Sequence, residues 1–307
     1  MTAPESPARL LPDGAEMPFP EISAAMARRN DEHATLSRVL TATIVAVGPV
    51  DLLEAAAAAL RTLGGHTGVR GILISVDSAA RRPPRLAGDI VALSGLRPSF
   101  VNNAVAALRL SSLPTIVWWR GGRADMLADL AQLADRVVLE GAPREIWPRA
   151  AELFDVAAFS DLRWTRLTRW RTLMANFFDI PEVRDAAAGF SRLRITGTDE
   201  AAAALFAAWL LGSLGRAGEV ELEFTRSQRG AFIEAVRFGD TEQELSMRLV
   251  PSGSCVMTSA AVRGHRGATR TVAVGEQSLA ALMTEELRVR ARDRAFEAAV
   301  LAFLGRS

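Results

Sequence analysis

The sequence contains no lysine and no tyrosine, and these two absences exclude several kinds of catalysis. All 36 basic side chains are arginines, as is common in proteins from GC-rich genomes. Without lysine, the chain cannot form a Schiff base or supply the phosphate-binding lysine of a P-loop. Without tyrosine, no phenol is available as a general acid.

Cysteine and histidine are also scarce. Cys255 is the only cysteine, so an internal disulfide is excluded and a reducing compartment is indicated. The three histidines, His33, His66 and His265, lie far apart in the sequence. Together with one cysteine they leave too few ligands for a tetrahedral zinc site. We expect no metal.

Long apolar runs and an excess of charge are missing as well. The longest apolar run, Ala201 to Leu211, is well short of the ~20 residues that cross a membrane. The formal net charge of +1 provides no overall attraction to nucleic acid or anionic lipid. The N-terminal stretch is acidic and proline-rich, unlike a signal peptide. We therefore expect a cytoplasmic protein that binds neither nucleic acid nor a membrane.

Motifs for cofactors and nucleophiles are absent. No G-x-G-x-x-G follows the first expected strand, and no G-x-S-x-G elbow is present. The carboxylate pairs Glu285–Glu286 and Asp199–Glu200 are expected on solvated parts of helices, and Cys255 is expected to be a buried structural residue. The sequence thus predicts no catalytic residue, no cofactor and no enzyme activity.

The first half of the chain alternates apolar strands with helices. Its 307 residues suggest two domains. Continuous apolar strands between helices are typical of a mainly parallel, doubly wound α/β sheet. One helical stretch is expected over 148–178, ended by Pro181. The expected strands are 39–47, 69–76, 89–93 (as an edge strand), 115–119 and 136–140.

The second half has short alternating strands, which predict an antiparallel meander within an α+β domain closed by C-terminal helices over 278–304. A boundary is expected near 181–190. The predicted organisation is a flexible tail at 1–22, an α/β domain at 23–180 and an α+β domain at 189–307.

Trp118, Trp119 and Arg120 stand at the end of the expected strand 115–119. Partners and ligands of open α/β sheets gather at the carboxyl ends of strands. Alternation along a strand sends the two indoles to opposite faces of the sheet. Either the indoles pack beneath the flanking helices, or this strand end contributes to a binding surface.

A second segment, residues 161–178, combines an apolar helical stripe with arginines in or beside it. A buried arginine needs a partner, because an unpaired buried charge costs several kcal/mol. Ion pairs with Asp161 or Asp179 are one explanation. A protein interface is the other, since tryptophan and arginine are over-represented in interface hot spots. The candidates are Trp164, Arg166, Trp170 and Arg171.

These two segments resemble the OpcA family. The first reads Leu-Pro-Thr-Ile-Val-Trp-Trp from Leu113 to Trp119 and is followed by an arginine; the second reads Asp-Leu-Arg-Trp-Thr-Arg-Leu-Thr-Arg-Trp-Arg over 161–171. Weaker matches extend the resemblance over roughly 38–305. The family often has an Asp-Ser pair where this chain has Glu140-Gly141, and thiol switching within the chain cannot carry over to a sequence with a single cysteine.

The resemblance implies a non-catalytic protein that binds glucose-6-phosphate dehydrogenase and favours its active oligomer. On this hypothesis the partner-binding residues are Trp118, Trp119, Arg120, Trp164, Arg166, Trp170 and Arg171.

An alternative hypothesis is a sensor or enzyme with an arginine-lined cleft for a sugar phosphate. Arg81, Arg82, Arg85 and Arg120 would then hold the anion, joined by Arg163 or Arg171, because arginine binds phosphate without the help of lysine. The two hypotheses are compatible if a sugar phosphate is an effector of the assembly protein.

Overall fold

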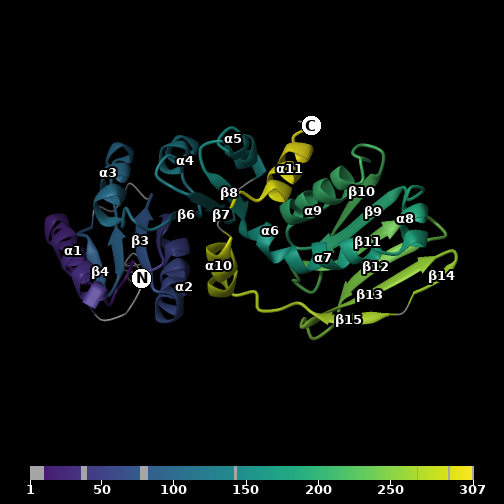
Figure 1. Cartoon of the computed structure of the whole chain (residues 1–307), viewed down its shortest axis with the longest axis horizontal. Coiled ribbons are helices and arrows are strands. Elements are labelled where there is room, and N and C mark those ends of the chain that lie inside the picture. The colour runs from purple at the N-terminus through teal and green to yellow at the C-terminus, as the bar shows by residue number, and fades with distance from the viewer. Residues whose placement is uncertain are drawn as a thin grey trace, which may run out of the picture. The chain divides into compact units, whose positions relative to one another are not determined.

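The computed structural model describes residues 10–35, 40–76, 82–141, 144–267, 269–289 and 291–305. The chain forms two compact units, each assembled from two stretches of sequence. Unit 1 comprises Met1–Leu162 and Ser278–Asp293, and unit 2 comprises Arg163–Gln277 and Arg294–Ser307 (Figure 1). Among the described residues, no helix is both long enough and apolar enough to cross a membrane.

Unit 1 contains an eight-stranded sheet in the order β1-β4-β5-β3-β2-β6-β7-β8. The six strands from β5 to β8 in this order are parallel, whereas β1 and β4 are antiparallel additions at one edge. The predicted parallel sheet is therefore confirmed. The strands are β1 (Ala15–Glu16), β2 (Ala42–Gly48), β3 (Val69–Ser75), β4 (Arg85–Ala87), β5 (Ile90–Leu93), β6 (Thr115–Trp119), β7 (Arg136–Leu139) and β8 (Ala158–Asp161).

Helices connect these strands and cover their apolar side chains. Every residue of β2, β3 and β6 is buried, which explains why these strands read as continuous apolar runs. Helix α2 (Val50–Thr67), which follows β2, packs on β3. Helix α10 (Leu279–Arg288), from the C-terminal part of the chain, packs against α2. The other helical elements are α1 (Phe19–Thr35), α3 (Pro98–Leu108), α4 (Ala124–Ala131), the 3₁₀ turn η1 (Arg144–Ile146) and α5 (Trp147–Ala151).

Three local expectations differ from the structure of unit 1. Strand β8 interrupts the helix expected over 148–178, because pairing with β7 outweighs the weak local preference of a four-residue segment. Strand β5 is not an edge strand, since β4 pairs with its outer side. The sequence predicts that the helix beginning at Leu52 closes at Gly64-Gly65, but α2 continues to Thr67 and is capped by Gly68, whose φ of 63° suits glycine.

Unit 2 contains a second sheet in the order β10-β9-β11-β12-β13-β14, with β15 also paired to β13. Only β10 is parallel to its neighbour β9, so the sheet is mostly antiparallel, as predicted. Its strands are β9 (Arg192–Gly197), β10 (Glu221–Arg226), β11 (Ile233–Gly239), β12 (Glu244–Leu249), β13 (Cys255–Val262), β14 (His265–Arg266) and β15 (Arg270–Ala273).

The helices of unit 2 pack on this sheet and on one another. Helix α9 contacts β9 and β10, α7 contacts β12 and α8 contacts β13, while α11 packs on α9. Pro181 does not only end a helix; it is the first residue of α8, a position that proline favours. The helices are α6 (Leu162–Arg166), α7 (Thr168–Phe177), α8 (Pro181–Ala187), α9 (Glu200–Ser213) and α11 (Arg294–Phe303).

The division between the units lies at Leu162, whereas the sequence places it near 181–190. The two closing helices also separate, because α10 packs against α2 in unit 1 and α11 packs against α9 in unit 2. At the N-terminus, residues 10–22 of the expected tail include β1 and the start of α1, while residues 1–9 lie outside the described part.

Candidate functional site

The sheet of unit 1 has a topological switch point between β2 and β6. The chain runs from β2 to β3 on one side, and β6 later pairs with the other side of β2. Open α/β sheets bind their ligands in the crevice at the carboxyl ends of the strands at such a point. Here Gly48 and Pro49 lead from β2 into α2, and Arg120 follows β6.

The side chain of Arg120 fills this crevice. It is 7% exposed, and its Nη1 donates a hydrogen bond to the carbonyl of Leu52 in the first turn of α2. Its Nη2 donates to Oε1 of Glu140 at 2.9 Å, and its Nε lies 2.7 Å from the other carboxylate oxygen. A Cβ on Gly48 would lie 3.1 Å from the Cβ of Arg120. Backbone and guanidinium thus occupy the place where this class of fold receives a ligand.

The two adjacent indoles support this arrangement from within the core. Trp118 is 0% exposed, and its Nε1 donates to Glu140 at 2.7 Å while Arg120 lies over its ring at 5.2 Å. Trp119 is 1% exposed. A Cβ on Gly122 would approach the Trp119 ring to 2.8 Å, so the loop after β6 needs glycine there.

In unit 2, Arg171 is stacked on Trp164, with its guanidinium carbon 3.5 Å from the ring centre. Trp164 is 2% exposed and also packs against Phe296 of α11 at 5.9 Å. Arg171 is half-buried, donates to Thr168 Oγ1 at 3.3 Å, and lies 6.0 Å from the ring of Trp209. The cation is therefore held between aromatic side chains of α6 and α9.

The other arginines of this segment are engaged as well. Arg166 is half-buried and lies over Phe232 at 5.4 Å. Arg163 forms an ion pair with Asp199 at 2.8 Å, a carboxylate that also caps α9 by accepting from the backbone N–H of Ala202. This partner lies 36 residues further along the chain, beyond the two acids that the sequence suggested.

The seven candidate residues form two groups, one in each unit. Trp118, Trp119 and Arg120 belong to unit 1, and the four residues of the second segment belong to unit 2. All four candidate tryptophans are at most 3% exposed, so in this structure they stabilise the interior of their own units. Their role in binding a partner stays a prediction.

The sequence analysis missed a buried acid. Glu286 was expected to be solvated, and this is wrong, because it is 4% exposed. It accepts hydrogen bonds from Arg136 at 3.1 Å and from Ser160 Oγ at 2.8 Å, which link α10 to β7 and β8. Glu286 lies four residues after Leu282 and three after Met283, so the helical period places it on the same buried face of α10. This spacing was the available signal of its burial.

The arginines of the alternative hypothesis do not converge on one cleft. Arg81 lies outside the described residues. Arg85 donates to the carbonyls of Gly14 and Pro12, while Arg120 is engaged as described above. Arg82 lines a shallow hollow of about 610 Å³ together with Phe100, which is 53% exposed. In the described part of the chain, no cluster of histidine, cysteine and acidic residues forms a metal site.

A doubly wound sheet in one unit and a mostly antiparallel sheet in the other define the class of fold. A crystal structure of an oxidoreductase from Sinorhizobium meliloti shares it with a TM-score of 0.50 and 10% identity, covering 87% of this chain and 96% of that one. At this identity the likeness shows the fold alone.

Sequence comparison shows which proteins part of this chain is similar to. Residues 157–300 match a family model that describes the C-terminal domain of a glucose-6-phosphate dehydrogenase subunit. The chain is 27% identical over 124 residues to a putative OxPP cycle protein OpcA of Synechocystis, and 26% identical over 150 residues to that of Synechococcus elongatus. These matches cover 37% and 45% of this chain.

Part of the chain is thus similar to OpcA proteins, in agreement with the resemblance that its two segments predicted. The matched regions span only 26% and 34% of the length of these two curated relatives.

Proposed function

We propose that this chain binds glucose-6-phosphate dehydrogenase and favours its active oligomer, without catalysing a reaction itself. The observation that carries the proposal is the match of residues 157–300, most of them in unit 2, to a domain named as part of a subunit of that dehydrogenase. The similarity to proteins named as putative OxPP cycle proteins supports a role in that pathway.

The filled switch point supports a non-catalytic role. A dinucleotide needs backbone N–H groups at the start of the first helix and room for its pyrophosphate. Pro49 has no N–H to offer at the N-cap of α2, and Arg120 occupies the adjacent space through its contacts with Leu52 and Glu140. This chain therefore has the side chain of Arg120 at the position where such folds usually bind a ligand.

An activator must bind the active oligomer more tightly than the inactive form, since only a difference in affinity shifts an equilibrium. A shift of ~100-fold corresponds to about 2.7 kcal/mol of coupling free energy. A small number of well-placed arginine and aromatic contacts supply a free energy of this size in protein interfaces.

Arg166 and Arg171 are the candidate residues that can take part directly, because both are only half-buried. The neighbouring tryptophans would act by positioning these cations: Trp164 lies beneath Arg171, and Trp170 fills the core of the same segment. In unit 1, Trp118 and Trp119 are buried and would likewise act by positioning Arg120 at the end of β6.

The test is a binding assay between the full chain and the dehydrogenase of the same organism. Arg166→Ala and Arg171→Ala should each weaken binding about tenfold or more, as expected for hot-spot positions. Arg169→Ala is the matched control, because Arg169 is exposed on α7, the helix that carries Arg171, and has no role in the proposed contact. Circular dichroism checks that each variant is folded. Equal affinity of all three variants and the unaltered chain would remove these positions from the interface.

A further inference from the structure

The sheet of unit 2 has one face that the helices do not bury. Along β9, β11 and β12, buried side chains alternate with exposed or half-buried ones. The buried set includes Ile195, Val236 and Met247, which face the helices. The opposite set is polar and strongly enriched in arginine: Arg194, Thr196, Arg237, Ser246 and Arg248.

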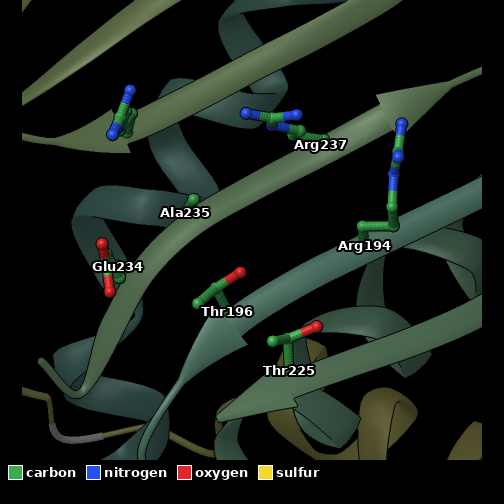
Figure 2. A pocket seen from close by; sticks show the side chains of 7 residues that line it. Arg194, Thr196, Thr225, Glu234, Ala235 and Arg237 are labelled. Atoms are coloured by element: carbon green, nitrogen blue, oxygen red, sulfur yellow. The ribbon is translucent and has the colours of Figure 1, made fainter. Parts of the chain in front are cut away.

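A cavity of about 270 Å³ opens on this face around Ala235. Ala235 lies directly opposite Thr196 on β9 and Arg248 on β12, so its small side chain leaves a hollow between two longer neighbours. Figure 2 shows Glu234 and Arg194 on opposite sides of this hollow, with Ala235 and Thr196 between them. We call it the open-face cavity; its lining residues are Arg194, Thr196, Thr225, Glu234, Ala235, Arg237 and Arg248.

Three guanidinium groups line the open-face cavity, and nearby carboxylates neutralise only part of their positive charge. Arg194 and Arg237 are directly opposed on adjacent strands, an arrangement in which like charges repel. One carboxylate lies near both, since Glu244 is 3.1 Å from Arg194 and 4.0 Å from Arg237. Arg248 forms no ion pair with any described residue. A ligand with two or more negative charges would relieve this repulsion.

The other side of the cavity is suited to hydroxyl groups. The carboxylate of Glu234 accepts a hydrogen bond from Ser227 at 2.6 Å and pairs with Arg229 at 3.5 Å, and its two oxygens keep acceptor capacity for a further donor. The hydroxyls of Thr196 and Thr225 also line the space, and either can donate or accept. A cavity slightly below the ~300–1,000 Å³ of drug-sized sites suits a smaller molecule.

We propose that the open-face cavity binds a small phosphorylated polyol. Its phosphate lies between the guanidiniums of Arg237 and Arg248, with Arg194 beside them, and its hydroxyls face Glu234 and the two threonines. This inference goes beyond the proposed function: it assigns a metabolite site to unit 2, on arginines other than those first suspected. Its test measures the binding of a sugar phosphate, so a failure of the proposed function would not by itself contradict it.

Isothermal titration calorimetry of the full chain with glucose 6-phosphate tests the proposal, with glucose and inorganic phosphate as the two partial ligands. We expect saturable binding of the ester that is at least tenfold tighter than that of either part. The variant with both Arg237→Gln and Arg248→Gln should lose it. Arg192→Gln is the matched control, because Arg192 is exposed on the same sheet, pairs with Glu221 and does not line the cavity.

Four results would overturn the proposal. The first is no saturation at millimolar glucose 6-phosphate, and the second is unchanged affinity in the double variant. The third is inorganic phosphate that binds as tightly as the ester, which would reveal a simple anion site. In the fourth, the double variant loses the dehydrogenase but not the sugar phosphate, which would make this face a protein contact instead.

Discussion

The guanidinium of Arg171 lies over the indole of Trp164, with 3.5 Å between its central carbon and the ring centre. This contact joins α6 to α7, and through Phe296 and Trp209 it reaches α11 and α9. A stack of this kind combines cation–π attraction with close packing. It leaves part of the cation accessible at the surface.

Removing either partner of this stack should destabilise the chain to different degrees. We expect Arg171→Ala to lower the free energy of unfolding by about 1–2 kcal/mol, and Trp164→Ala by about 3–5 kcal/mol, because the indole is buried. A double-mutant cycle measured by urea unfolding should show coupling between them. Arg169→Ala, on the exposed side of α7, should change stability by less than about 0.5 kcal/mol. Additive effects of the two substitutions would contradict the stack.

The buried carboxylate of Glu286 should be among the most sensitive polar positions of unit 1. Glu286→Ala leaves Arg136 buried without its charge partner, which should cost about 3–5 kcal/mol. The adjacent Glu285 is exposed, so Glu285→Ala provides a control with nearly unchanged stability. Thermal unfolding of the two variants makes the comparison. Similar melting temperatures would show that the network with Arg136 and Ser160 does not stabilise the fold.

The crevice filled by Arg120 predicts that the chain does not bind a nicotinamide dinucleotide. Titration with NADPH, followed by its fluorescence, should give no saturable change at submillimolar concentrations. Arg120→Ala should destabilise the chain by about 3 kcal/mol, because Glu140 and Leu52 lose their shared partner. Tight NADPH binding by the unaltered chain would contradict the occupied switch point.

Asp240 predicts a contribution to stability that depends on pH. Its carboxylate accepts hydrogen bonds from the backbone N–H groups of Glu242 and Gln243, which hold the pKa of Asp240 below its usual value. A carboxyl with a lowered folded-state pKa stabilises the fold above its unfolded pKa, and this stabilisation is lost as the pH falls through the folded value. Asp240→Asn should therefore reduce stability at neutral pH and weaken its decline in acid. Asp185→Asn is the control, because Asp185 is an exposed acid on α8. Equal stability–pH profiles for both variants would show that the hydrogen bonds to Asp240 do not cause the pH dependence.

Local apolar patterns were sufficient to predict the parallel sheet of unit 1. Strand β6 begins and ends at the predicted residues, because a proline precedes it and a Gly-Gly pair follows. Strand β8 could not be predicted in the same way, because its position depends on pairing with β7 rather than on its own composition.

Long-range pairing also limited the prediction of the site. The arginine-rich segments were correctly singled out as needing partners, but Asp199 and Glu140 come from distant elements. Alternation in the second half of the chain predicted its strands one at a time. Only the register between the strands shows that Arg194 and Arg237 are opposed, so the open-face cavity had no signal in the sequence alone.

The most direct test of the central proposal is sedimentation velocity of glucose-6-phosphate dehydrogenase, with and without this chain, combined with initial-rate measurements on the same samples. We predict that the chain co-sediments with the dehydrogenase, changes the distribution of its oligomers and raises its specific activity, while the chain alone reduces no NADP⁺. Independent sedimentation of the two proteins with unchanged activity, or dehydrogenase activity in the chain by itself, would contradict the proposal.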